Sequence, residues 1–118
     1  MEDVLEKAVE RMRDLGAEFC DARYQDSSSL TIRISDREVR TLADSRLAGV
    51  CLRARIGGSW GYSSTVCTDQ RTLLEVAEGA VRSARSGTSE GKRIPEQPAR
   101  TGTYKARVRI LPSSVPVE

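Results

Sequence analysis

Apolar residues recur every three to four positions in two parts of the chain, and each run predicts an amphipathic helix. The first run covers residues 2–15 and ends before Gly16, with Val4, Leu5, Ala8, Val9, Met12 and Leu15 on one side. The second begins after Thr68 or Asp69 as the N-cap and continues to about Ser86, just before Gly87. Because Thr and Asp favour the N-cap and Gly favours the position past a helix end, the flanking residues support both helices.

Between these helices the apolar period changes to two, which is typical of strands. We expect five strands, over residues 18–25, 29–35, 38–44, 47–56 and 59–65. Asp26 and the three serines after it predict a turn, as does Gly57-Gly58. In the second strand we expect Leu30, Ile32 and Ile34 to point inward.

These elements predict an α+β domain with a single mainly antiparallel or mixed five-stranded sheet, in the order α-β-β-β-β-β-α. Two helices pack on one face and leave the other uncovered. The uncovered face would carry Thr31, Arg33, Cys51, Arg53, Arg55, Ser59 and Ser63. We expect this face or an edge strand to meet another domain or subunit.

The final part of the chain differs in composition, since all four prolines lie beyond Gly87. We therefore place an α/β domain at residues 1–87 and a tail at residues 88–118. Within the tail, residues 88–103 are expected to be a linker and residues 104–111 a short strand.

Composition narrows the function classes. Hydrophobic residues make up 38% of the chain and aromatic residues 4%, which predicts a modest aliphatic core of the kind that packs on a second domain. A net charge of +2 gives no strong electrostatic case for nucleic acid or membrane. Three widely spaced cysteines without a Cys-x-x-Cys pair, no secretion-signal pattern and no long apolar run indicate a cytoplasmic protein with reduced thiols.

Residues 49–65, Gly-Val-Cys-Leu-Arg-Ala-Arg-Ile-Gly-Gly-Ser-Trp-Gly-Tyr-Ser-Ser-Thr, resemble a segment of the TldD/PmbA family, also called modulators of DNA gyrase. Residues 16–23 and 31–39 resemble the family's preceding blocks, although Asp36-Arg37 replaces the usual turn glycine. Residues 104–118 are similar to the tract that joins its first and second domains, but Leu111 stands where an Asp usually precedes the proline. The Trp60-Gly61-Tyr62 form is closer to the TldD branch than to the PmbA branch.

The resemblance implies the amino-terminal domain of a zinc metallopeptidase, or of its PmbA-type partner, that assembles as a dimer and degrades or processes unfolded peptides. The family's zinc is held by a His-Glu-x-x-x-His helix and a later cysteine in its carboxyl-terminal domain. This chain has no histidine and no Cys/Asp/Glu cluster with ligand spacing, so no catalytic or metal-binding residue is carried over. We expect a piece of a longer protein, inactive alone, with zinc in the absent domain.

Candidate contact residues are Arg33, Arg53 and Arg55, whose guanidinium groups suit a peptide or partner carboxylate. Ion pairs within the sheet are the alternative and the commoner role. We assign structural roles to Gly57, Gly58, Trp60 and Gly61, with Trp60 mostly buried.

The hydroxyl groups of residues 63–65 and the Cys51 thiol are considered as reactive side chains. The hydroxyls of residues 63–65 lack a base that would activate a nucleophile. Nothing in the sequence lowers the pKa of Cys51, so an inert thiol is expected there.

Three functions therefore remain open. The first is a non-catalytic domain that walls the cleft of a TldD-like peptidase and supports its dimer assembly. The second is a free-standing protein-interaction module. The third, an arginine-rich nucleic-acid binder, is disfavoured by the low net charge and the scarce aromatic residues.

Overall fold

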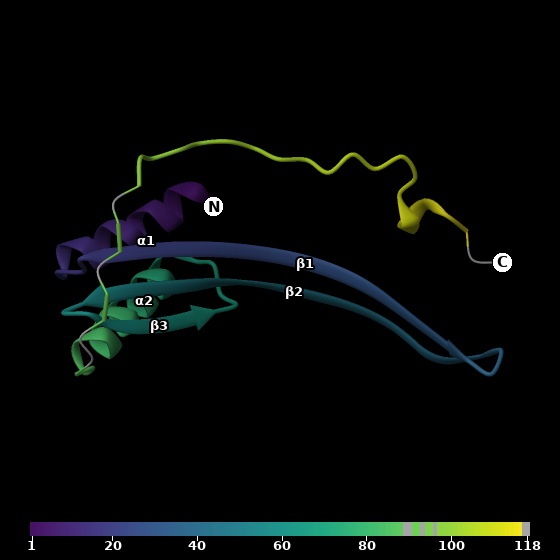
Figure 1. The fold of residues 1–118 in the computed structure, drawn as a ribbon, viewed down its shortest axis with the longest axis horizontal. Helices are drawn as coiled ribbons and strands as arrows, with labels where there is room; N and C mark the ends of the chain where they lie inside the picture. Colours follow the sequence, from purple (N-terminus) through teal and green to yellow (C-terminus); the bar gives the residue numbers. More distant parts are fainter. Residues whose placement is uncertain (89–90, 93, 96, 117–118) are drawn as a thin grey trace.

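The computed structural model describes residues 1–88, 91–92, 94–95 and 97–116. The elements follow the order α1 (Glu2–Asp14), β1 (Phe19–Ser35), β2 (Glu38–Ile56), β3 (Ser59–Thr65), α2 (Gln70–Arg85) and the short 3₁₀ helix η1 (Pro112–Ser114). The fold is α+β, with β1, β2 and β3 side by side in one antiparallel sheet. Figure 1 shows β1 and β2 extending as a long curved ribbon well beyond β3.

The prediction of a five-stranded sheet is wrong, because one expected turn and one expected break between strands are continuous strand. Asp26 and the serines after it lie within β1, and residues 45–46 lie within β2. Paired strand residues take the place of both: the Ser29 and Ser45 hydroxyls are 2.8 Å apart, and Arg46 donates two hydrogen bonds to the Asp26 carboxylate. Asp and Ser tolerate this extended backbone because both sides of the ribbon are open to solvent here.

The two true hairpin turns lie where the sequence predicts them. Asp36 and Arg37 have φ values of 54° and 63°, and Gly57 and Gly58 have values of 57° and 84°. Positive φ at both central residues matches the twist of the paired strands. A register shift between Arg33 and Ile34 adds a bulge near the ribbon tip.

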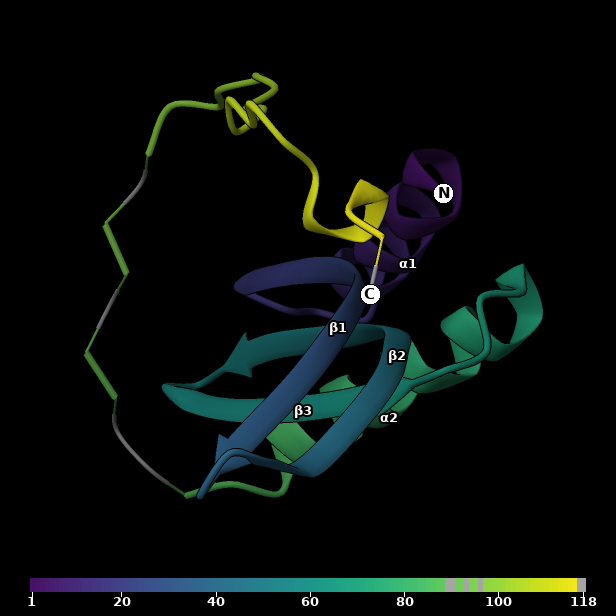
Figure 2. The same cartoon turned by 90° about the vertical axis from the view of Figure 1, so that its right-hand side faces the viewer.

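Both helices pack on the same face of the sheet, α1 against β1 and α2 against β2 and β3. In Figure 2 they lie to the right of the sheet, and the chain after α2 leaves along the opposite side. The core between the layers is aliphatic, and its largest fully buried side chains are Met12, Leu52, Leu73 and Val81. Small residues allow close packing, since a Cβ on Gly61 would overlap the backbone of Ala80 and Ala84 in α2.

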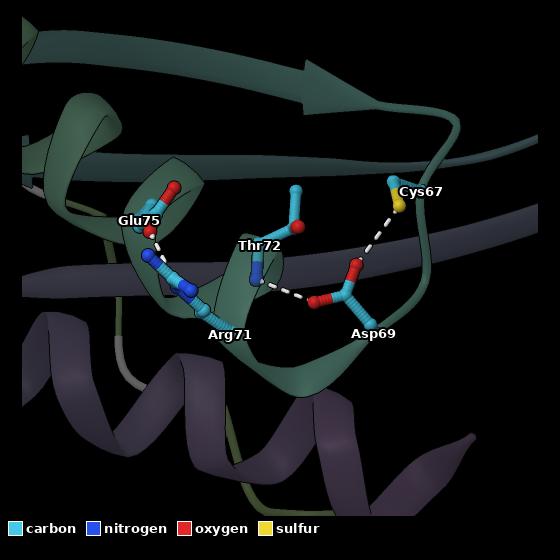
Figure 3. Close-up of polar contacts among 5 residues, drawn as sticks. All are labelled: Cys67, Asp69, Arg71, Thr72 and Glu75. Atoms are coloured by element: carbon cyan, nitrogen blue, oxygen red, sulfur yellow. Dashed lines mark hydrogen bonds and ion pairs between the residues drawn. The ribbon is translucent and has the colours of Figure 1, made fainter.

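Each helix has its expected terminal signals. Gly16 follows α1 with a φ of 100°, and its N–H donates to the Arg13 carbonyl. Asp69 is the N-cap of α2, where its carboxylate accepts from the backbone N–H of Thr72 at 2.9 Å (Figure 3). Arg11 and Glu78 form an ion pair of 2.7 Å that joins α1 to α2.

The strand predicted over residues 104–111 is not present; the segment is exposed and has no strand partner among the described residues. A strand requires a neighbour for its backbone hydrogen bonds, and none lies beside this segment in the part of the chain that the structure describes. Residues 89, 90, 93 and 96 of the expected linker, and residues 117–118, lie outside the described residues. No helix in the described part of the chain is long and apolar enough to cross a bilayer.

Candidate peptide-contact face

The sheet face away from the helices carries a cluster of three aromatic rings and an arginine at its centre. Arg53 on β2 donates from Nε to both Asp21 oxygens, at 2.9 and 2.8 Å, and its terminal nitrogen lies 2.7 Å from the same carboxylate. Its guanidinium also lies 5.7 Å from the centre of the Phe19 ring and 5.1 Å from that of Trp60. The hydrogen bond to Asp21 is the main cause that raises the pKa of Arg53.

The aromatic part of this cluster is partly open to solvent. The Trp60 ring stacks on Tyr62 at 6.3 Å and meets Phe19 edge to face at 5.7 Å. Trp60 is partly buried, on the uncovered face rather than in the core between the layers, whereas Tyr62 is 60% exposed. The face therefore offers a flat aromatic surface next to a guanidinium that is already paired.

The structure places the three candidate arginines in different environments. Arg53 lies in the central cluster, and Arg55 lies beneath the tail, 5% exposed, where it donates to the Gly91 carbonyl at 2.8 Å. The Nε of Arg55 is buried and has no hydrogen-bond partner among the described residues. Arg33 is exposed near the ribbon tip, about 40 Å along the strands from Arg53 at 3.3 Å per residue. Arg33 therefore does not share a site with the other two.

A cleft lies at each end of the central cluster. The larger, about 980 Å³, is lined by Glu18, Phe19 and Arg55 of the sheet and by Gly91, Ile94, Pro95 and Gln97 of the tail. The Glu18 carboxylate on its rim accepts a hydrogen bond from the Gly57 N–H at 2.9 Å.

The smaller cleft, about 440 Å³, lies where β3 ends and the ribbon begins. Its lining includes Arg23, Leu47, Cys51, Thr65 and Val66. Arg23 is exposed and forms no ion pair with any other described residue. Leu47 and Val66 are 68% and 79% exposed, so the cleft combines apolar side chains with one unpaired cation.

An open strand edge begins at this smaller cleft. β3 pairs only with residues Val50 to Ile56 of β2, so residues 38–49 of β2 have no strand partner on that side within the described chain. The sequence suggested an exposed edge in general terms. Its position depends on the length of β2, which the predicted elements divide into two strands at residues 45–46.

The residues considered as nucleophiles have no activating base beside them among the described residues. Thr65 Oγ1 accepts from the backbone N–H of Cys67 at 3.0 Å, and Cys51 is exposed on the rim of the smaller cleft. The described residues contain no group of three or more His, Cys, Asp or Glu side chains that could hold a metal ion. Zinc therefore does not fit the side chains of this part of the chain.

Comparison with known proteins identifies the family. The sequence model of the PmbA/TldA metallopeptidase domain 1 family matches residues 20–84, which is more than half of the chain. The chain belongs to this family and represents its amino-terminal domain. No curated protein matches the chain.

Proposed function

We propose that the chain is the non-catalytic first domain of a TldD-like zinc metallopeptidase that processes unfolded peptides in the cytoplasm. In this proposal the domain walls the substrate cleft and supports the assembly of two subunits. Zinc and the catalytic residues belong to a further domain of the full protein. The alternative within the family is the same domain in the non-catalytic PmbA-type partner, where its contacts to peptide and second subunit would be similar.

The observation that carries the proposal is the open edge of β2 beside the smaller cleft. An unpaired edge can take an extended peptide as an additional strand, and backbone hydrogen bonds then bind it with little dependence on sequence. Such binding suits an unfolded substrate. The cleft lined by Leu47, Val66 and Arg23 would receive one apolar side chain of the peptide and favour a carboxylate beside it.

The experiment is a titration of the ¹⁵N-labelled chain with an unstructured apolar peptide, followed by amide chemical shifts. We expect shifts at residues 44–49 of β2 and at the end of β3. The matched control is the same peptide N-methylated at every residue, which has no backbone N–H left to donate the hydrogen bonds of a strand. Equal binding of both peptides, or shifts confined to other surfaces, would contradict the proposal.

A free-standing interaction module would give the same peptide binding. The coding sequence of the full protein distinguishes the two functions, since a peptidase requires a downstream His-Glu-x-x-x-His helix. The uncovered face does not favour nucleic acid, because Asp21 already neutralises Arg53 at its centre.

A further inference from the structure

Five large apolar side chains form an exposed stripe on the distal part of the ribbon. This ribbon stripe consists of Leu30, Ile32 and Ile34 on β1 with Val39 and Leu42 on β2. Their exposed fractions lie between 49% and 69%. Monomeric proteins seldom expose contiguous apolar patches of this kind without a binding role.

The ribbon stripe continues the face of the sheet that the helices cover. Ile32 pairs with Leu42, and Ile34 pairs with Val39, so each pair lies on one face. Alternation along β1 places Ile32 on the same face as the core-facing residue Ala22. The expectation that Leu30, Ile32 and Ile34 point inward is therefore wrong as to burial, because the helices end before they reach the ribbon (Figure 1).

The opposite side of the ribbon is polar. It carries Ser27, Ser29, Thr31, Arg33, Thr41 and Ser45, together with two apolar side chains, Ala43 and Leu47. An isolated two-stranded ribbon is marginally stable in water. A partner that covers only the apolar side would stabilise it and leave the polar side in solvent.

The charges at the two ends of the ribbon stripe indicate the partner. Asp44 lies beside Leu30 at the base of the stripe, and Arg37 lies next to Asp36 in the turn at its tip. None of these three charged residues forms an ion pair with another described residue, whereas the neighbouring Asp26–Arg46 and Glu38–Arg40 pairs are closed.

We propose that the ribbon stripe is the docking surface for a second copy of this chain. Two ribbons would stack face to face about a two-fold axis that passes between the Ile32–Leu42 and Ile34–Val39 pairs. Such an axis lays each β2 antiparallel over the other and brings Arg37 of one copy onto Asp44 of its partner. The surface is then self-complementary in both apolar contact and charge. This inference rests on the proposed function, since it names the surface used for subunit assembly.

The first test is sedimentation of the full 118-residue chain across a concentration series. We expect a reversible dimer that Ile32→Lys weakens at least tenfold. Thr41→Lys is the matched control, because Thr41 is also exposed but lies on the other side of the ribbon, and it should leave the dimer unchanged. A monomeric wild-type chain, or a dimer that survives Ile32→Lys and so uses a strand edge, would overturn the proposal. If the chain is monomeric and the amides of the stripe are protected from hydrogen exchange, the chain's own tail covers the stripe. That result would also overturn the proposal.

The second test is a charge exchange that does not introduce a lysine into the stripe. Asp44→Arg and Arg37→Asp should each weaken the dimer, and the double variant should restore it. Failure of the double variant to restore association would exclude the two-fold arrangement. Peptide titration distinguishes the two proposals. An Ile32→Lys chain that is monomeric but still shows peptide-induced shifts at residues 44–49 supports both of them. A wild-type chain that forms the dimer but does not bind the peptide refutes only the proposed function.

Discussion

The Arg53 guanidinium lies 5.1 Å from the centre of the Trp60 ring, on the sheet face that neither helix covers. The same guanidinium is paired with Asp21 on the neighbouring strand. Three strands are thereby linked by one side chain. The uncovered face therefore has cross-strand contacts of its own, which are separate from the core between the sheet and the helices.

We expect these contacts to be cooperative but individually small. Asp21→Asn, Arg53→Gln and the double variant form a cycle measured by urea denaturation. Because 40% of the Asp21 side chain and 43% of the Arg53 side chain are exposed, the coupling free energy should be about 0.2–1 kcal/mol. Arg53→Gln should also change the fluorescence of Trp60, whereas Arg33→Gln on the distant ribbon tip should not. An unchanged Trp60 emission in Arg53→Gln would contradict the stacking.

Gly61→Ala should destabilise the domain by about 1–3 kcal/mol, because its Cβ would overlap the backbone of α2 and force the helix away from β3. Gly102→Ala is the control, since nothing lies within 4 Å of a Cβ at that position. Thermal denaturation of the two variants measures the difference. Equal melting temperatures would show that α2 does not approach β3 as closely as described.

The α2 N-cap should contribute a pH-dependent part of the stability. Hydrogen bonds from the Cys67 thiol and from Thr72 lower the pKa of Asp69 from 3.8 to about 2 (Figure 3). Because the folded-state pKa lies below the unfolded value, the stabilisation is present in full above pH 3.8 and is lost as the pH falls toward 2.

Asp69→Asn is the test of this dependence. The variant keeps an oxygen that can cap the helix but removes the titrating group, so its unfolding free energy should depend less on pH between 4 and 2. NMR titration of the Asp69 carboxyl in the wild-type chain gives its pKa directly. A value near 3.8 would contradict the two hydrogen bonds.

The three thiols should differ in reactivity. Burial raises the pKa of Cys20, whose thiol donates to the Val9 carbonyl at 3.6 Å, whereas Cys51 and Cys67 are exposed. A thiol reagent at neutral pH should therefore modify Cys51 and Cys67 faster than the partly buried Cys20, in contrast to the inert thiol expected from the sequence at Cys51. Mass spectrometry of a time course with the Cys20→Ser variant as control assigns each rate. Rapid modification of Cys20 in the folded chain would show that α1 does not cover it.

The purified chain should bind no stoichiometric zinc and cleave no peptide. The physical reason is that zinc sites use histidine or clustered cysteine ligands, and the sequence contains no histidine. Elemental analysis after dialysis and a mass-spectrometric peptide assay measure the two properties. One tightly bound metal ion per chain would contradict the assignment of catalysis to another domain.

The sequence by itself determined the two helices, the two hairpin turns and the family. Helical periodicity, Asp69 as a cap, and Gly57-Gly58 act within a few residues, so local pattern suffices to identify them. The family follows from motifs that remain recognisable without coordinates.

Only the tertiary structure decided the length of the strands and the environment of each exposed side chain. Asp26 and Ser27 have turn propensity, but pairing with residues 47 and 48 of β2 keeps them extended. Period-two alternation identifies an apolar face in Ile32 and Leu42 but not whether a helix covers it, because coverage depends on where distant elements end. The tail over Arg55 is likewise a contact between distant parts of the chain, which no local pattern encodes.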